Sequence, residues 1–345
     1  MKKYILLLFI AAFAACTTKP PFKGYHHVTV KPLYENELLS IRAIDTMGQN
    51  LAFAGSNNSY GMYNAKTNST TVNVQKYDTL ALEFRAVAHT QNDFFMLAVG
   101  NPGLLYKTGD DGKMKIVYKE EGEKVFYDAM QFWNDKEGIA IGDPTDGCLS
   151  VIITRDGGNT WEKLTLDTFP KAADGEAAFA ASNTNIAIKG DNAWIMSGGV
   201  ESNVYKTTDK GKTWTKYKTP AIQGKATQGM YSIAFYDEMN GVAIGGDYTK
   251  PEENKANKII TADGGKTWKV LAAGKNPGYR SCIQYIPNSD AEGMVAIGFK
   301  GIAVSNDMGQ TWEQVADEGF YTLRFVNDSV AYAAGNGRIA KLTFN

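Results

Sequence analysis

The stretch T-A-D-G-G-K-T-W at residues 261–268 decides the fold, because three variants of it recur along the chain. They are T-R-D-G-G-N-T-W at 154–161, T-T-D-K-G-K-T-W at 207–214 and S-N-D-M-G-Q-T-W at 305–312. The tryptophans that end these octets are 53, 54 and 44 residues apart. Periods of about 40–50 residues with strand-like content are typical of the blades of a β-propeller. The repeat therefore predicts an all-β ring of similar units.

Each octet is predicted to form a hairpin turn with a structural role. Its aspartate caps backbone N–H groups of the turn, and its glycine takes a positive φ that a Cβ would penalise. The threonine and the tryptophan start the next strand, and the indole packs against a neighbouring blade. The residues expected to play these structural parts are Asp156, Trp161, Asp209, Trp214, Asp263, Trp268, Asp307 and Trp312.

Seven apolar segments that end in glycine mark the second strand of seven units; they lie at 52–55, 97–100, 139–142, 194–198, 242–245, 295–298 and 331–335. A lone strand at 26–33 precedes the first unit, and the last unit has only three strands of its own. We expect the lone strand to close the last blade as its outer strand, which removes an exposed sheet edge. We predict a seven-bladed propeller of four-stranded antiparallel blades. Six blades are the alternative, because the first unit has no octet.

The first residues have the features of an export signal. Lysines at 2–3 precede an apolar run at 4–13 and two alanines, and the run is too short to span a bilayer as a permanent helix. The alanines lead into Cys16 and resemble a bacterial lipobox, so we expect Cys16 to be lipidated. An ordinary cleaved signal is the alternative. Thr17 stands where an aspartate would signal retention in the inner membrane.

These features divide the chain into three parts. We predict a lipoprotein signal peptide at 1–15, a short tether at 16–24 and a single propeller domain at 25–345. The expected location is the periplasmic side of the outer membrane, with the lipid anchor as the only membrane contact.

Composition and motif content argue against several classes of partner and cofactor. The chain has 36 basic and 37 acidic residues and a net charge of −1, which gives no reason to expect nucleic acid as a partner. Cys148 and Cys282 lie in non-adjacent repeats and are expected to be unpaired. The three histidines lack the spacing of metal ligands, so no metal site is expected. No G-x-G-x-x-G unit is present, so no dinucleotide cofactor or oxidoreductase activity is supported.

The candidate site lies where loops meet on one face of the ring. Loops that enter the innermost strands and loops that follow the second strands share this face. We predict a ligand-binding site around one channel mouth, with a salt-bridged rim between blades as the alternative. The residues are Arg85, Asp128, Asp143, Glu176, Asp247, Tyr248 and Arg280.

Three of these acids raise a catalytic alternative. Carboxyl groups about 5–9.5 Å apart perform glycosidic acid/base chemistry, and Asp128, Asp143 and Glu176 are candidates for such a pair. A Ser-His-Asp set is unsupported, because the only internal histidine, His89, lies in a turn-like segment at 88–93. A glycan-processing hydrolase, either a glycosidase or a sialidase-like enzyme, is therefore the alternative to a binding module.

Five further segments carry a more specific pattern: Y-D-A-M-Q-F-W-N-D at 127–135, I-G-D-P-T-D-G at 141–147, G-E-A-A-F-A-A-S at 175–182, G-G-D-Y-T-K-P at 245–251 and G-Y-R-S at 278–281. Together they resemble a bacterial family related to photosystem II stability/assembly factors, and the octets resemble the Asp-box, or bacterial neuraminidase repeat. The resemblance implies a seven-bladed propeller. Photosynthetic relatives are assembly chaperones that bind a membrane-protein partner through a basic channel region.

The resemblance favours a binding or assembly module over an enzyme. The partner is expected to be an envelope protein or a glycan at the channel mouth. Sialidases share the Asp-box but need an arginine triad and an Arg-Ile-Pro segment. Arg42, Arg85, Arg280 and Arg324 offer arginines, whereas the Arg-Ile-Pro segment is missing.

Overall fold

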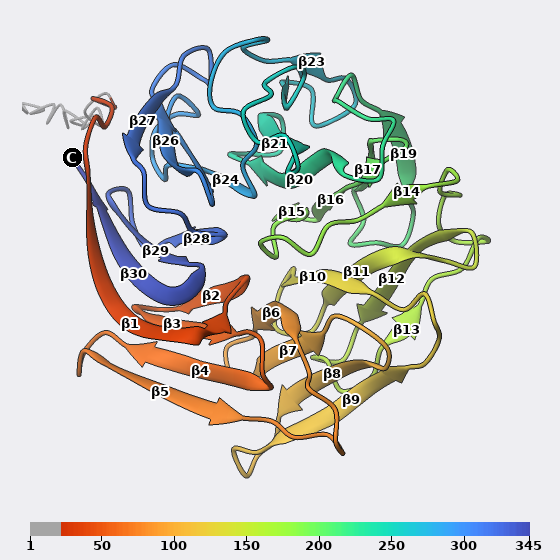
Figure 1. The fold of residues 1–345 in the computed structure, drawn as a ribbon. Coiled ribbons are helices and arrows are strands. Elements are labelled where there is room, and N and C mark those ends of the chain that lie inside the picture. The colour runs from red at the N-terminus through yellow and green to blue at the C-terminus, as the bar shows by residue number, and fades with distance from the viewer. Residues whose placement is uncertain (1–21) are drawn as a thin grey trace, which may run out of the picture.

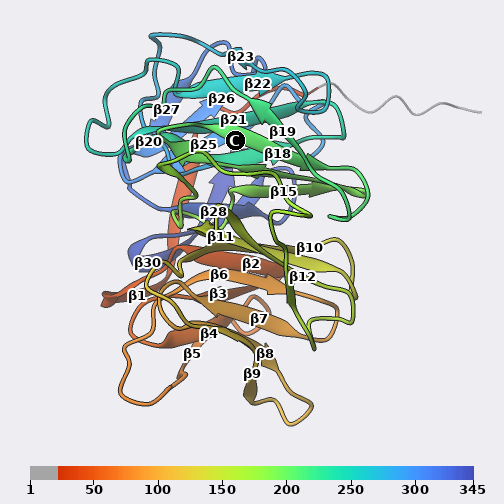
Figure 2. The same cartoon turned by 90° about the vertical axis from the view of Figure 1, so that its right-hand side faces the viewer.

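The computed structural model describes residues 22–345 and shows the predicted all-β, seven-bladed propeller (Figures 1 and 2). Each blade is a four-stranded antiparallel sheet with its first strand nearest the central axis. Cys16 and most of the predicted tether lie outside the described residues. Within 22–345, no helix has the length and hydrophobicity needed to cross a membrane.

The first three blades follow one another in sequence order. From the axis outward they contain β2 (Ala43–Met47), β3 (Asn50–Ala54), β4 (Ser59–Asn64) and β5 (Ser69–Val74); β6 (Phe84–His89), β7 (Phe94–Ala98), β8 (Gly103–Thr108) and β9 (Met114–Glu120); and β10 (Tyr127–Phe132), β11 (Gly138–Thr145), β12 (Cys148–Thr154) and β13 (Glu162–Lys163).

The next three blades contain β15 (Ile186–Lys189), β16 (Asn192–Met196), β18 (Asn203–Thr207) and β19 (Thr215–Lys218); β20 (Gln228–Phe235), β21 (Gly241–Asp247), β22 (Lys258–Thr261) and β23 (Lys269–Val270); and β24 (Cys282–Tyr285), β25 (Met294–Gly298), β26 (Gly301–Ser305) and β27 (Glu313–Ala316). Two short strands, β14 (Glu176–Ala177) and β17 (Gly198–Gly199), extend the fifth sheet at its inner edge.

The last blade joins the two ends of the chain. It contains β28 (Thr322–Phe325), β29 (Val330–Ala334) and β30 (Asn336–Phe344), and its outer strand is β1 (Val28–Ser40). The pairing runs antiparallel from Val28 opposite Phe344 to Ser40 opposite Asn336. The predicted ring closure is therefore confirmed, with a strand that continues to Ser40 rather than ending at residue 33. Closure leaves the last sheet without an open outer edge on β30.

The turns of the four octets share one hydrogen-bond pattern. In each, the aspartate accepts hydrogen bonds from the backbone N–H of the threonine four residues later, at 2.9–3.0 Å, and from its hydroxyl. The glycine before that threonine has a φ between 76° and 83° in all four turns. The turn capping expected from the sequence is present, and it explains why aspartate and glycine hold these positions.

Aromatic side chains pack the octets against neighbouring blades. Trp268 is buried beside Trp194 of the fourth blade, and Trp194 donates a hydrogen bond to the carbonyl of Gly264 at 2.8 Å. Trp161 lies edge-on to Phe95 of the second blade. Only Trp268 of the four octet tryptophans is buried, while the other three are partly exposed. The free Cys148 and Cys282 are both buried within the apolar clusters.

One segment, residues 178–185, lies between the inner strands of the ring, and we refer to it as the channel segment. Its polar groups bond to every blade. The bonding partners are Arg42 in the first blade, Val87 in the second, Met130 in the third, Met196 in the fourth, Ile233 in the fifth, Ser281 in the sixth and Thr322 in the seventh. The channel segment thus separates two mouths of the channel.

We predict that Asp263→Ala lowers the free energy of unfolding by about 0.5–2 kcal/mol, as loss of a helix cap does. Trp268→Ala should cost more, about 3–5 kcal/mol, because it leaves a cavity between two blades. Urea denaturation measures both. The exposed Asp110→Ala serves as the control and should change stability little. Equal stability of wild type and Trp268→Ala would contradict the packing described.

Candidate binding site at one mouth of the channel

A cavity of about 410 Å³ opens at the mouth formed by the starts of the inner strands. Side chains from several blades line it, and residues 177–181 form its floor. Its charged groups are Arg42, Arg85 and Asp143, and the rest of its lining is mostly aromatic or alanine. A concave, largely apolar cavity with a few convergent charged groups is the usual form of a binding site.

The two arginines are oriented by the channel segment. Arg42 donates a hydrogen bond to the carbonyl of Ala181 at 3.4 Å, and Arg85 donates to the carbonyl of Ala180 at 3.5 Å. Arg85 also pairs with Glu83 at 2.8 Å. Arg42 instead lies over the ring of Tyr321, 3.8 Å from its centroid. Burial and the nearby Arg85 lower the pKa of the Arg42 guanidinium.

Arg42 is half-buried and forms no ion pair with a carboxylate among residues 22–345, and the nearby Glu83 is paired with Arg85. The buried Nε of Arg42 has no hydrogen-bond partner in that range. A partly desolvated cation without a paired counter-ion is costly. An anionic group entering this cavity would supply the missing charge. Arg42 is thus the residue that most directly indicates the ligand's chemistry.

Aromatic rings form one wall of the cavity. Phe179 of the channel segment stacks on Tyr231, with centroids 3.9 Å apart and planes inclined by 5°. Tyr279 meets Tyr231 edge-on at 4.9 Å. Tyr248 and Phe299 lie at the rim with about half of their surface exposed, 49% and 43%. Such rings offer flat apolar contact at low entropic cost.

Two carboxyl groups stand at the third blade. Asp143 accepts a hydrogen bond from the backbone N–H of Ala178 at 2.8 Å, and burial raises its pKa to about 6. Asp128 is fully buried, and neither of its oxygens has a hydrogen-bond partner in the described structure. Burial, together with the charge of Asp143, raises the pKa of Asp128 well above its usual range. Burial therefore favours the neutral acid form of Asp128 over the carboxylate.

Matching irregularities in two strands place these carboxyl groups together. The register of β10 and β11 shifts between Tyr127 and Ala129, and that of β11 and β12 shifts between Gly142 and Pro144. A Cβ on Gly142 would lie 2.2 Å from the carbonyl oxygen of Phe126, so only glycine allows this close approach. Bulges of this kind re-aim side chains next to functional sites.

The cavity unites three of the seven predicted residues, Arg85, Asp143 and Tyr248, with Asp128 close enough to Arg85 and Asp143 to interact with both. The sequence prediction left out Arg42 and the ring of aromatic residues. Tyr279 lies within one of the quoted family-like segments, which is the only signal that pointed to it. The ion pairs formed by the predicted residues are with Glu83 and Lys216, neither of which is among the seven.

Glu176 does not line this cavity but an adjoining one of about 1110 Å³, which it shares with Asp143. Its side chain is fully buried in the fourth blade, where it pairs with Lys216 at 2.8 Å and accepts a hydrogen bond from Tyr205 at 2.9 Å. Burial alone would raise the pKa of Glu176, but Lys216 and the neighbouring hydroxyl and amide donors outweigh it and lower the pKa. The short strand β14 turns the side chain into the blade, which sequence spacing does not reveal.

Asp247 and Arg280 also lie apart from this cavity. Asp247 caps its own turn by accepting hydrogen bonds from the backbone and hydroxyl of Thr249, at 3.0 and 2.6 Å. Arg280 donates to Gln314 at 3.0 Å and lines a separate cavity of about 330 Å³ with Glu252. Burial lowers the pKa of Arg280 to about 10. Asp247 ends β21 and Arg280 precedes β24 by two residues, but neither residue lines the mouth cavity.

Comparisons with known proteins support the fold and little beyond it. A sequence model of the family described as Sortilin-Vps10 (sortilin, neurotensin receptor 3) matches residues 149–279. No match was found among curated proteins. A solved structure of YCF48 bound to D1 peptide is 15% identical with a TM-score of 0.65, and the match covers 94% of this chain and 98% of that one.

Two other solved propellers are similar in shape. The WD40 repeats of RRP9 give 9% identity and a TM-score of 0.64, covering 94% of this chain and 99% of that one. U3-55K gives 10% identity and a TM-score of 0.61, covering 92% and 98%. At these identities the likeness defines the class of architecture, a seven-bladed β-propeller.

The raised pKa values predict an unusual pH dependence. Between about pH 4 and 6 the native state binds protons at Asp128 and Asp143 that the unfolded chain releases, so these two groups make stability fall as pH rises. Asp143→Asn keeps an acceptor for Ala178 and removes the part of this loss that comes from Asp143. We expect the variant to gain about 1–2 kcal/mol relative to wild type between pH 4.5 and 7.5.

Urea denaturation at the two pH values measures the difference. The matched control is Asp110→Asn, a change at an exposed aspartate. Parallel pH profiles for wild type and Asp143→Asn would contradict the raised pKa.

Proposed function

We propose that this protein is a lipid-anchored cell-envelope propeller that acts as a binding or assembly module, and that it holds a segment of a protein partner in the mouth cavity. The observation that carries the proposal is Arg42, a half-buried cation that forms no ion pair with a carboxylate in the described structure and whose Nε is buried without a partner, in a cavity walled by aromatic rings. This combination suits a peptide better than a purely polar ligand.

The contacts define the chemistry of the partner segment. Arg42 and Arg85 would bind a carboxylate, either an acidic side chain or a free C-terminus. Tyr231, Tyr279 and Phe299 would hold an apolar or aromatic side chain next to it. Asp143 at the third blade can receive a backbone or side-chain N–H of the same segment when it is ionised.

The comparison with solved structures supports a peptide as the ligand class. YCF48 is seen bound to D1 peptide, and the present chain shares its fold along nearly the whole length. The resemblance to photosystem II assembly factors points the same way. The mouth of this chain differs from the basic channel region of those factors, because acids stand beside its arginines. Its partner segment is therefore not expected to be the one that they bind.

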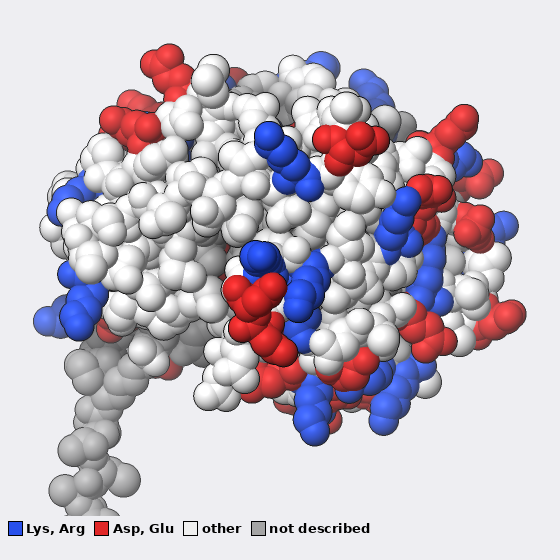
Figure 3. All heavy atoms as spheres, turned by 90° about the horizontal axis from the view of Figure 1, so that it is seen from below, with Lys and Arg blue, Asp and Glu red and all other residues white. Residues whose placement is uncertain are grey.

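The envelope location is part of the proposal. The lipobox-like sequence ending at Cys16 supports a lipid anchor, and the expected site is the periplasmic side of the outer membrane. The surface seen in Figure 3 carries basic and acidic side chains side by side. Such an interspersed surface gives no reason to expect broad electrostatic adhesion to a membrane on that side.

Labelled palmitate tests the anchor. We expect the native protein to incorporate palmitate in cells and Cys16→Ala to lose the label. Cys148→Ala is the control and should keep it, since Cys148 is buried. Absence of label on the native protein would overturn this half of the proposal.

Binding to a peptide array tests the mouth cavity. Purified protein would be screened against peptides drawn from envelope proteins, each synthesised with a free acid and with an amidated C-terminus. We expect Arg42→Gln to weaken the best peptide by at least about tenfold, since a charge-assisted hydrogen bond is lost. Arg155→Gln, at an exposed octet position on the outside of the third blade, should bind as wild type.

A measurement of thermal stability separates loss of a ligand contact from loss of folding. Melting temperatures of Arg42→Gln and wild type should agree closely if the arginine serves the ligand. Loss of binding that only follows loss of folding, or equal binding by both proteins, would contradict the proposal.

A glycan-processing hydrolase remains the second candidate because of one observation. Asp143 stands in the mouth cavity with a pKa raised to about 6, a value suited to a general acid. Its two possible partners are less suitable, since Asp128 is fully buried and Glu176 is paired with Lys216. Turnover of an envelope or plant glycan that Asp143→Asn abolishes would favour this candidate over the binding module.

A further inference from the structure

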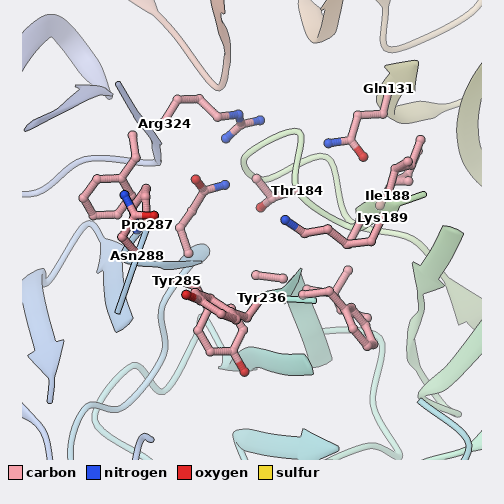
Figure 4. Close-up of a pocket in the computed structure, with 16 residues that line it drawn as sticks. Gln131, Thr184, Ile188, Lys189, Tyr236, Tyr285, Pro287, Asn288 and Arg324 are labelled. Carbon is pink, nitrogen blue, oxygen red and sulfur yellow. The ribbon is translucent and has the colours of Figure 1, made fainter. Parts of the chain in front are cut away.

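A second cavity lies at the opposite mouth of the channel, where the inner strands end. It has a volume of about 570 Å³, and Figure 4 shows the side chains that line it. Thr184 of the channel segment belongs to its lining, whereas residues 177–181 belong to the first cavity. The channel segment therefore forms a partition with a different site on each side.

Two cations point into this second cavity from different blades. Lys189 ends β15 of the fourth blade, and Arg324 lies in β28 of the seventh (Figure 4). The residues that line the cavity include no aspartate or glutamate. Neither cation forms an ion pair with a carboxylate in the part of the chain that the structure describes. The cavity thus presents positive charge that is not neutralised from within its own walls.

Arg324 is held in place by neutral groups. Its guanidinium donates hydrogen bonds to the carbonyls of Leu323 at 2.8 Å and Asn183 at 2.9 Å, and to the hydroxyl of Thr322 at 3.1 Å. These contacts use three of the five N–H groups of an arginine. The remaining donors, with the full charge, are available on a side chain whose orientation is fixed. A pre-oriented guanidinium binds an oxyanion with little further loss of entropy.

Lys189 completes the cationic pair. Its ammonium makes no hydrogen bond within residues 22–345. Its charge acts on Asp237: burial alone would raise the pKa of that carboxyl, but hydrogen bonds from Asn240 and Met239, with a smaller contribution from Lys189, lower it. The carboxylate of Asp237 is thus held by hydrogen bonds within its own turn, and the ammonium of Lys189 is free to contact a ligand.

Neutral polar groups and rings complete the cavity. The carbonyl Oε1 of Gln131 is buried and has no partner in the described part of the chain, so it can accept a hydrogen bond from a ligand hydroxyl. Gln284 adds a second amide to the lining. Tyr236 and Tyr285 meet edge-on at 5.6 Å on the fifth and sixth blades and give the cavity an apolar side.

We propose that this second cavity is a binding site for a small organic oxyanion that carries a hydroxyl group, a hydroxycarboxylate or a phosphorylated compound, held between Lys189 and Arg324. The inference concerns the mouth opposite to the one that takes the partner segment and does not depend on it. Two cations, an unused amide acceptor and the lack of lining carboxylates together select an anion of this kind.

Isothermal titration calorimetry at low ionic strength tests the site, with malate and inorganic phosphate as separate probes. We expect saturable binding of at least one of them, and the stronger probe distinguishes a carboxylate from a phosphate ligand. If malate is the stronger, succinate, which lacks the hydroxyl, should bind more weakly. The site is contradicted if neither malate nor phosphate saturates by about 20 mM, a generous bound for a paired-cation site.

Single substitutions test whether the probe binds in the second cavity. Lys189→Met removes the charge but keeps the apolar stem and breaks no hydrogen bond in the described structure, so it should fold normally and weaken binding by at least about tenfold. Lys212→Met, at an exposed octet position, should bind the probe as wild type does. Unchanged binding by Lys189→Met, or equal loss in Lys212→Met, would overturn the assignment.

Discussion

The channel segment, residues 178–185, is the constraint on which both mouths of this propeller depend. An irregular stretch inside a channel must satisfy its backbone N–H and C=O groups, because water cannot reach them all. Here every blade supplies a partner, from Arg42 in the first blade to Thr322 in the seventh. Hydrogen bonds to all seven blades fix the segment in the channel, and through these bonds the segment links the inner parts of the blades.

Carbonyl groups of the channel segment orient the cations at both mouths. Ala181 and Ala180 accept from Arg42 and Arg85 at one mouth, and Asn183 accepts from Arg324 at the other. Neutral carbonyl acceptors fix the direction of a guanidinium without cancelling its charge. The result is positive charge at two separated cavities in a chain whose net charge is only −1. Local placement, rather than overall composition, therefore determines the electrostatics of the mouths.

Much of the fold was predictable from the sequence, since its signals are local. The octets define turns through side chains within a few residues of one another, and the glycine-ended segments reveal the second strand of each blade. The seven blades and the closing strand follow from this repetition. The sequence also located Arg85 at the head of an inner strand and Asp143 at the end of a second strand, and both residues line the mouth cavity.

Side-chain direction was not predictable in the same way. Glu176 turns into its blade because the short strand β14 pairs with β17, and Lys216, 40 residues later, supplies the counter-ion. Arg42 was not assigned to the mouth because its key neighbour, Tyr321, is at the other end of the chain. Both outcomes depend on contacts between distant segments, which a single sequence does not report.

Hydrogen–deuterium exchange of the native protein tests the central role of the channel segment most directly. The backbone N–H groups of Met130, Met196 and Ile233 all donate to this segment. If it holds the blades together, these amides should exchange only through global unfolding and rank among the slowest in the protein. Exchange of these amides as fast as that of exposed loops would show that the segment is not fixed in the channel, and would contradict the account of both cavities.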